Sequence, residues 1–179
     1  MKVVIYGNLH HKNKHGLIMM LNHLGYEYIC TNDINHIKNS DVVYSAAEPF
    51  DTSKYPNTFF IFGPQFSVFP DHKLQMLDIH CKNWIYIQPS NWAVEIWKLL
   101  GVKIPLKPFP FPVDTNTFCP SLKDKNKVVL YMKSRHPEEK NTIASFLNAR
   151  NISYRIFDYD RKYQEKEFLE YLKEARYGI

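Results

Sequence analysis

Lysine, arginine and histidine side chains gather directly after an apolar segment in the second half of the chain. In VVLYMKSRHPEEK, residues 128–140, the strand-like run gives way to Lys133, Arg135 and His136, and Lys140 lies about one turn into the helix expected next. The planar guanidinium of arginine matches the geometry of phosphate oxygens, so one interpretation is an anion site. The other is a solvated surface turn, and spacing alone favours neither.

A second polar cluster follows the first apolar segment, in NLHHKNKHG, residues 8–16. The imidazoles of His10 and His11 can donate or accept hydrogen bonds. With Asn8, and with Gly16 where the next helix opens, they are candidates for contacting an acceptor substrate. A metal site needs further ligands, and no matching carboxylate cluster is evident, so we expect no metal. A solvated loop remains the alternative.

Other candidates follow later apolar segments. Glu48 could orient a hydroxyl or act as a base, although a solvated turn also explains it, and Gln65 follows the next segment. Ser90 and Asn91 stand where an apolar segment becomes a helix. Ser90 is expected to cap that helix, whose free N–H groups could also bind an anion. No G-x-G-x-x-G or G-x-x-x-x-G-K-[ST] pattern occurs, which argues against an ordinary NAD enzyme or a P-loop NTPase.

Short apolar segments alternate with helix-like segments in the part of the chain that carries these candidates. Strands are predicted at residues 2–7, 26–30, 41–46, 58–63 and 83–89, a further extended piece at 102–112, and helices at 17–25, 72–81 and 91–101. Such alternation indicates a parallel sheet covered by helices on both faces. Ligands bind beyond the carboxyl ends of the strands in these sheets, and the candidates follow predicted strands.

The last of these helices illustrates the periodicity. Four of its apolar residues fall on one face, namely Trp92, Ile96, Leu99 and Leu100. The tryptophans Trp84, Trp92 and Trp97 are expected in the core rather than at a ligand.

A proline-rich and charged connector, residues 108–127, precedes a second series of segments. In that series strands are predicted at 127–132, 152–160 and 176–179, and helices at 138–150 and 165–175, about half of a doubly wound domain. The sequence therefore predicts an α/β protein: a Rossmann-like acceptor domain in residues 1–118 and part of a second Rossmann-like, donor-binding domain in residues 119–179. A terminal strand with an open edge suggests a fragment or a reduced two-domain protein.

Composition restricts the protein class. Apolar residues form 45% of the 179 residues, enough for a core, and the formal charge of +5 is spread over loose groups of cations, so phosphorylated small molecules are as plausible as polynucleotides. No transmembrane segment or signal peptide is evident, and we expect a cytoplasmic protein. The three cysteines, Cys30, Cys81 and Cys119, form no zinc pattern and are expected to be reduced, half-buried thiols.

Three motifs, in order between Gln88 and Lys140, together resemble GT-B glycosyltransferases, in particular the large retaining family four. PSNWAVEIWKLLG is similar to PSxWxxExxxxxG through Pro89, Ser90, Trp92, Glu95 and Gly101. PFPVDTNTFCP is similar to NGVDTERFxP through Val113, Asp114, Thr115, Phe118 and Pro120. YMKSRHPEEK is similar to YVGRLxPEKG through Tyr131, Pro137, Glu138 and Lys140.

The resemblance implies transfer of a sugar from a nucleotide-sugar, such as a UDP- or GDP-sugar, to a hydroxyl of a glycan, lipid-linked or protein acceptor. The acceptor would lie against the first domain. The donor diphosphate would lie on Lys133, Arg135 and Lys140, whose charges can neutralise the leaving group without a metal. No cofactor and no nucleic acid partner are expected, and no residue is identified as catalytic.

The chain departs from the family pattern at several points. Arg135 is displaced by one position, the first loop is rich in histidine instead of glycine, FGPQF lacks the family's histidine, and the later E-x7-E segment is absent. These differences keep open a non-catalytic module that binds a nucleotide-sugar or glycan. A basic scaffold for nucleic acid is a weaker third possibility.

Overall fold

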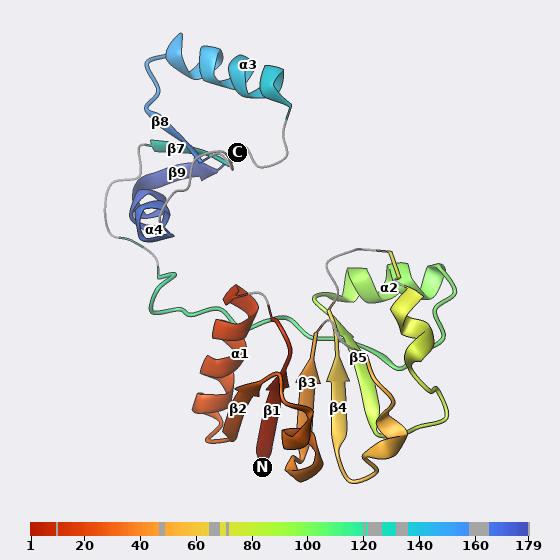
Figure 1. The fold of residues 1–179 in the computed structure, drawn as a ribbon. Helices are drawn as coiled ribbons and strands as arrows, with labels where there is room; N and C mark the ends of the chain where they lie inside the picture. The colour runs from red at the N-terminus through yellow and green to blue at the C-terminus, as the bar shows by residue number, and fades with distance from the viewer. Residues whose placement is uncertain are drawn as a thin grey trace. The chain divides into compact units, whose positions relative to one another are not determined.

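The computed structural model describes residues 1–9, 11–46, 49–64, 69–70, 72–119, 121, 127–131, 136–157 and 165–178. The chain divides into two compact units, Met1–Asp114 and Thr115–Ile179 (Figure 1). The predicted division, after residue 118, differs from this one by a few residues. Each unit is built on a parallel sheet, and the predicted α/β, Rossmann-like fold class is confirmed.

The first unit holds a six-stranded sheet whose strands all run parallel. Its strands are β1 Lys2–Tyr6, β2 Glu27–Thr31, β3 Val42–Ser45, β4 Phe59–Phe62, β5 Trp84–Gln88 and β6 Leu106–Pro108. They lie in the order β2-β1-β3-β4-β5-β6. The five strands predicted before residue 90 are therefore present, and the extended piece expected at 102–112 contributes β6.

Among the described residues of the first unit, two α-helices and three 3-10 helices connect these strands. They are α1 His11–His23, α2 Asn91–Leu99, η1 Ile34–Asn39, η2 Thr52–Lys54 and η3 His72–Met76. The polar loop predicted for residues 8–16 is wrong from His11 onward, because α1 begins there. Short connections between strand and helix are the norm in α/β units, and lysine favours helix.

The helix predicted at residues 72–81 is also wrong in extent, since only the 3-10 helix η3 forms. Asp78 ends the helical path: its Oδ1 accepts from the backbone N–H of His80 at 2.9 Å, and its carbonyl accepts from Trp84 Nε1 at 2.9 Å. A short acidic side chain that bonds to nearby backbone in this way competes with helix continuation.

Side chains alternate between the two faces of the sheet, with the period of two that a strand imposes. One face carries Val4, Val43, Phe60, Phe62, Trp84 and Tyr86, packed against Ile37, Leu77 and Trp97. The other carries Val3, Ile5, Tyr44 and Ile87, packed against Leu17 and Leu21 of α1. Both faces are therefore covered, as predicted, and each fully buried large side chain contributes about 1.5–3 kcal/mol.

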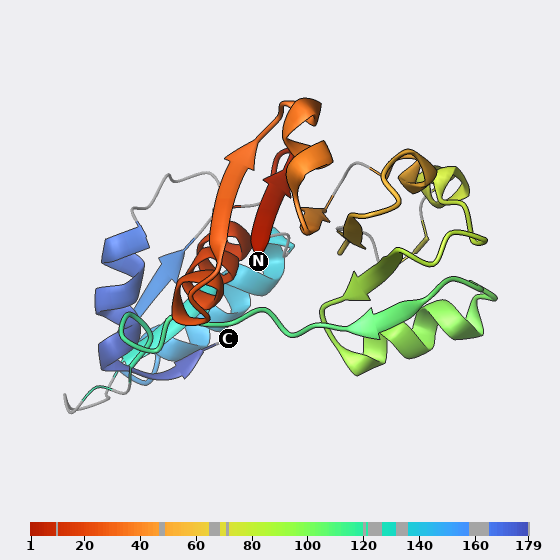
Figure 2. The same ribbon diagram turned by 90° about the horizontal axis from the view of Figure 1, so that it is seen from below.

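Helix α2 turns a different face to the core from the one expected. It buries Ala93, Val94 and Trp97, while the exposed fractions of Trp92 and Leu99 are 62% and 83%. The helix carries two apolar stripes. The one with the small Ala93 packs on the sheet, beside β6 (Figure 2), with the Trp97 ring 5.2 Å from that of Tyr86. Trp84 and Trp97 lie in the core as predicted, but Trp92 does not.

The segment after β6 packs on the same face of the sheet as α1. The rings of Phe109 and Phe111 meet edge to face at 5.4 Å, and Phe111 contacts the ring of Tyr44 at 6.5 Å. Both phenylalanines pack against the same core cluster as α1. We call residues 109–114 the strap.

The second unit repeats the start of the first. Its elements are β7 Lys127–Tyr131, α3 Pro137–Asn148, β8 Tyr154–Phe157, α4 Glu165–Glu174 and β9 Ala175–Gly178. In this sheet the first strand, β7, lies between the second, β8, and the third, β9. In the first unit β1 likewise lies between β2 and β3. All strands and helices predicted beyond residue 127 are present. Their small core is formed around Val128 and Leu147.

Two predictions about the protein class can be compared with the structure. Among the described residues, no helix has the length and apolar character needed to cross a membrane. Cys30, Cys81 and Cys119 are free thiols, but Cys30 and Cys119 are exposed instead of half-buried.

Candidate functional site

The carboxyl ends of β1 and β3 mark the point where the strand order reverses. From β1 the chain passes through α1 to β2 on one side, and β3 lies on the other side of β1. In open parallel sheets this reversal opens a crevice in which ligands bind. We call the row of residues that follows the strands of the first unit the carboxyl edge.

Asn8 lies at this reversal point, exposed, two residues after the end of β1. Gly7 before it has a φ of 81° and donates its N–H to the Thr31 carbonyl at 3.2 Å. A glycine at positive φ directs the chain away from the strand. The exposed amide of Asn8 is therefore available to a ligand. His10 and the side chain of His11 lie outside the described residues.

Gly16 does not belong to the carboxyl-edge loop, because it lies buried inside α1. A Cβ built on it would come within 2.4 Å of the Pro112 carbonyl oxygen. Gly16 therefore packs against the strap, and this close approach of two backbone segments explains why the position holds a glycine.

The ends of β3 and β4 form a closely packed part of the carboxyl edge. Tyr44 donates its hydroxyl to the Gly63 carbonyl at 2.7 Å. Gly63 has a φ of 87°, and a Cβ there would approach the Ile87 carbonyl to 2.5 Å. Burial raises the pKa of the Tyr44 hydroxyl, so the group stays a neutral donor. Glu48 and Gln65, predicted for this region, lie outside the described residues.

Ser90 caps helix α2, as expected. Its Oγ accepts from the backbone N–H of Ala93 at 3.2 Å, and its backbone is extended. The first intrahelical bond then runs from the Val94 N–H to the Ser90 carbonyl at 3.2 Å. Asn91, the first helical residue, is exposed. Ser90 and Asn91 thus stand together at the carboxyl edge, as the sequence predicted.

Gln88 is a polar residue at this edge that is not among the predicted acceptor contacts. It ends β5, it is only 3% exposed, and its Nε2 has no hydrogen-bond partner among the described residues. Its backbone carbonyl accepts from the Phe109 N–H at 2.7 Å. The feature of the sequence that points to Gln88 is an amide side chain at the end of an otherwise apolar strand.

Only one of the three predicted diphosphate ligands can be placed. Lys133 and Arg135 follow β7 and lie outside the described residues. Lys140 is half-buried in the first turn of α3. That helix begins at Pro137, and His136 caps it by accepting from the Glu138 N–H through Nδ1 at 3.4 Å. A helix start after the first strand of a unit is a position where phosphates bind.

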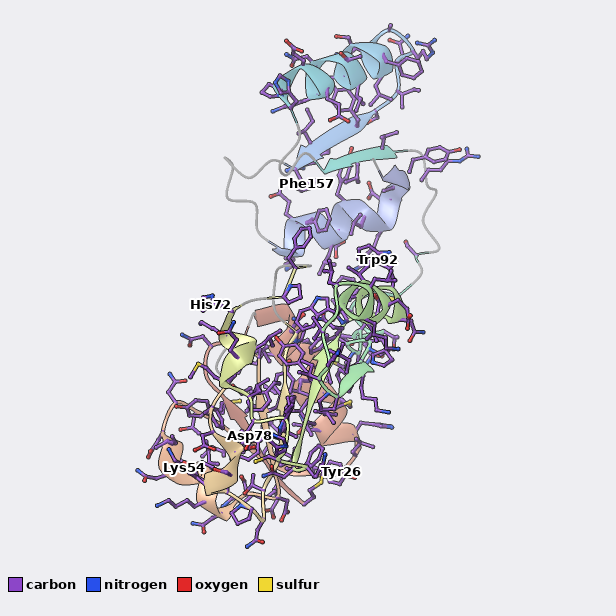
Figure 3. The ribbon with its side chains drawn as sticks, turned by 90° about the vertical axis from the view of Figure 1, so that its right-hand side faces the viewer. Tyr26, Lys54, His72, Asp78, Trp92 and Phe157 are labelled. Atoms are coloured by element: carbon purple, nitrogen blue, oxygen red, sulfur yellow. The ribbon has the colours of Figure 1, made fainter. Side chains whose placement is uncertain are left out.

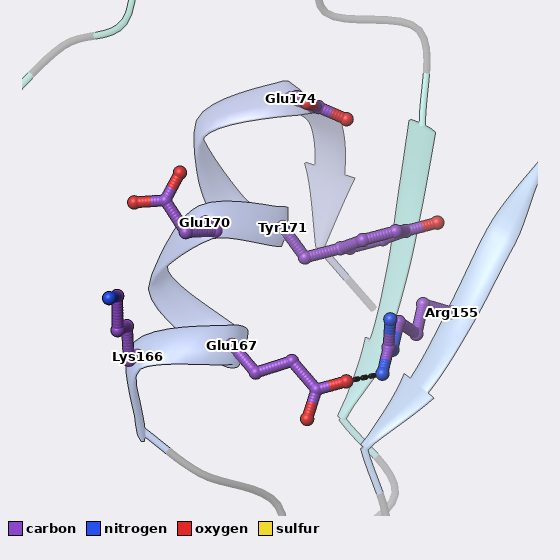
Figure 4. Close-up of a pocket in the computed structure, with 6 residues that line it drawn as sticks. All are labelled: Arg155, Lys166, Glu167, Glu170, Tyr171 and Glu174. Carbon is purple, nitrogen blue, oxygen red and sulfur yellow. Dashed lines mark ion pairs between the residues drawn. The ribbon is translucent and has the colours of Figure 1, made fainter.

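A separate hollow of about 390 Å³ lies on the second unit, between β8 and α4 (Figure 4). Arg155 forms an ion pair with Glu167, and its guanidinium lies 5.7 Å from the centre of the Tyr171 ring. Glu170 and Glu174 also line the hollow. Because the arginine is paired and three carboxylates are present, this hollow does not suit a diphosphate.

A second hollow, of about 620 Å³, opens at the opposite end of the first sheet. Its lining includes Phe59, which begins β4, and Asn83, which precedes β5. The side-chain amide of Asn83 already has hydrogen-bond partners in the protein, because its Nδ2 donates to the carbonyls of Tyr55 and Thr58 at 3.0 Å each. None of the predicted site residues that the structure describes lines either hollow. Within the same residues, no group of acidic, histidine and cysteine side chains is arranged to hold a metal ion.

Comparisons of the chain with protein-family models, curated proteins and solved structures find no match.

Proposed function

We propose that the protein is a glycosyltransferase of GT-B type that transfers a sugar from a nucleotide-sugar to an acceptor hydroxyl. The observation that carries the proposal is the repeated topology. Two consecutive parallel α/β units start with the same relative strand order, and a proline-rich segment links them. In the GT-B glycosyltransferases that the motifs resemble, one such unit binds the acceptor and the other binds the donor.

The positions of the three motifs support this proposal. Ser90 starts a helix directly after a strand, and Pro137 is the first residue of a helix that follows β7. Asp114 closes the strap and ends the first unit. Strand exits and helix starts are the places where α/β proteins bind their ligands.

In the proposed reaction, the first unit binds the acceptor and the second binds the donor. Asn8, His10, His11, Ser90 and Asn91 are the proposed acceptor contacts, with Glu48 and Gln65 after β3 and β4. Lys133, Arg135 and Lys140 are proposed to hold the diphosphate and to stabilise the negative charge that develops on it as the sugar leaves. The acceptor is a glycan, lipid-linked or protein hydroxyl, and the proposed compartment is the cytoplasm.

The proposal is tested by incubating the chain separately with UDP-glucose, UDP-N-acetylglucosamine and GDP-mannose and measuring release of UDP or GDP by donor hydrolysis, in which water takes the sugar in place of the acceptor. We expect release from one donor and its loss in Arg135→Ala. Binding of UDP or GDP without release would support the non-catalytic binding module instead. If neither nucleotide bound, and random oligonucleotides bound with a steep salt dependence, the chain would be a basic scaffold.

A further inference from the structure

The side chain of Gln88 is a buried hydrogen-bond donor that lacks a partner. Its Nε2 is inaccessible and, within the described part of the chain, nothing accepts a hydrogen bond from it. Leaving a buried donor unsatisfied costs folding free energy, and native proteins satisfy nearly all such groups. An orphan of this kind at the carboxyl edge therefore indicates a position for a ligand oxygen.

The face of the sheet on which Gln88 lies directs it toward the start of α2. Residues of β5 alternate, so Gln88 shares a face with Trp84 and Tyr86, and this is the face on which Trp97 of α2 packs. Gln88 closes the strand and α2 begins three residues later. The orphan amide thus lies at the same end of the sheet as the first turn of the helix.

The first turn of α2 offers further donors. Ser90 Oγ occupies the N–H of Ala93, and the Val94 N–H begins the intrahelical bonds. The N–H groups of Asn91 and Trp92 precede these bonds and have no intrahelical acceptor. Together with the positive end of the helix dipole, they favour an anionic group.

Trp92 adds a flat apolar surface at the same place. Its exposed fraction is 62%, although tryptophan is usually largely buried. Side chains of a helix lean toward its N-terminus, so we expect the indole of Trp92 to lie over the start of α2. Figure 3 labels Trp92 at the same end of the first unit as His72, which follows β4, and away from Lys54 and Asp78, which precede β4 and β5.

We propose that Gln88, the first turn of α2 and Trp92 form a subsite for a sugar that carries a phosphate or carboxylate group. The ring of the sugar packs on the indole, the anionic group accepts from the N–H groups of Asn91 and Trp92, and a further oxygen accepts from Gln88. As an acceptor assignment this rests on the proposed glycosyltransferase function, and it narrows the acceptor to an anionic saccharide.

The alternatives fit these groups less well. A metal ion needs oxygen, nitrogen or sulfur atoms with a free electron pair as ligands. The orphan Nε2 of Gln88 and the backbone N–H groups of Asn91 and Trp92 are hydrogen-bond donors instead. A neutral sugar would offer no anionic group to the free N–H groups of Asn91 and Trp92 at the start of α2. A nucleotide also combines a flat ring with phosphate, so it is included in the test as a competing ligand.

The test uses the full chain and α-glucose 1-phosphate as the probe, with binding measured by calorimetry and by acrylamide quenching of tryptophan fluorescence. Because Trp84 and Trp97 are at most 2% exposed, quenching reports mainly on Trp92. We expect the probe to protect Trp92, and to bind more tightly than methyl α-glucoside, inorganic phosphate or UMP. Equal binding of phosphate alone, or preferred binding of UMP, would overturn the assignment of a sugar subsite.

Two variants and a control locate the binding. Trp92→Ala and Gln88→Met should each weaken binding of glucose 1-phosphate about 2- to 10-fold. Leu99→Ala, which removes another exposed apolar side chain at the far end of α2, should leave it unchanged. Unchanged binding in both Trp92→Ala and Gln88→Met, or no binding by the wild type, would refute the subsite.

Stability provides a second measurement for Gln88. Since Gln88→Met removes an unsatisfied buried donor at nearly constant volume, the midpoint of urea unfolding should rise while binding falls. A lower midpoint together with unchanged binding would mean that Gln88 has a structural role only, and would contradict the proposal.

The outcome also separates this subsite from the proposed reaction. Probe binding without nucleotide-sugar turnover would remove the glycosyltransferase proposal and leave the subsite. Turnover with an unchanged acceptor KM in Trp92→Ala and Gln88→Met would remove the subsite and leave the reaction.

Discussion

The carbonyl oxygen of Pro112 lies against the Cα of Gly16, so close that a Cβ on this residue would approach it to 2.4 Å. One residue away, His15 Nε2 lies 3.8 Å from Asp114 Oδ2. These contacts fasten the strap to α1, and Phe111 completes the core beneath it. The strap is therefore part of the first unit although its sequence resembles a linker.

Gly16→Ala should destabilise the protein. Alanine normally stabilises a helix relative to glycine, by about 0.5–1 kcal/mol. Here the new methyl group meets backbone of a segment anchored by two phenylalanines, so we expect overpacking to cost about 1–3 kcal/mol and to exceed that gain. Urea unfolding measures the change. Asn22→Ala, at an exposed position of the same helix, is the control and should be neutral or slightly stabilising.

A fragment of residues 1–118 should fold by itself, because the first unit has a complete sheet and two covered faces. A shorter fragment of residues 1–108, which keeps β6, should be much less stable, since it lacks Phe109 and Phe111 and leaves the α1 face partly uncovered. Circular dichroism during thermal unfolding compares the two. Equal stability would show that the strap does not support the core, and a noncooperative 1–118 fragment would show that the first unit needs the second.

The alternation of apolar segments was enough to predict the fold class, because each strand of a doubly covered sheet must be apolar on both sides. It could not predict which stripe of α2 is buried. Trp92 and Trp97 are equally apolar, and only the packing of Trp97 on Tyr86 decides between them. The alternation of apolar segments also did not predict the start of α1, because the polar, lysine-containing first part of this helix resembles a loop.

The candidate site was predictable to a similar degree. Residues after each strand could be identified from the sequence, and the structure places Asn8, Ser90 and Asn91 along one edge. The orphan donor of Gln88 could not be identified, because satisfaction of a hydrogen bond depends on neighbours that are distant in sequence.

Tyr44→Phe should lower stability at neutral pH, because the variant leaves the buried Gly63 carbonyl without its 2.7 Å donor. The expected loss is about 1–3 kcal/mol. Burial, with a smaller contribution from Tyr86, raises the pKa of the Tyr44 hydroxyl. A phenol whose folded pKa is raised stabilises the fold fully below its unfolded pKa of about 10, and that contribution is lost as pH rises from there through the folded pKa.

The difference in unfolding free energy between wild type and Tyr44→Phe should therefore stay constant up to about pH 9 and shrink as the pH rises past about 10. Urea unfolding at several pH values measures it, with Tyr26→Phe at an exposed tyrosine as the control. A difference that also stayed constant above about pH 10 would mean that Tyr44 ionises equally in the folded and unfolded states.

Arg135→Ala should weaken binding of UDP or GDP. Arg135 lies outside the described residues, so the argument rests on its position after β7 and before α3, where cations and helix N–H groups can meet one phosphate. Loss of one charge-assisted contact costs roughly 1.5–3 kcal/mol, which corresponds to about 10- to 150-fold in affinity.

The matched controls for this prediction are Lys123→Ala and Lys125→Ala, which remove the same charge from the connector instead of from the segment between β7 and α3. Calorimetric titration with UDP and GDP compares all three variants at one ionic strength, since diffuse attraction depends on salt. A loss confined to Arg135→Ala identifies a built phosphate site. Small equal losses in all three variants would mean that the net charge of +5, and not a specific arginine, attracts the nucleotide.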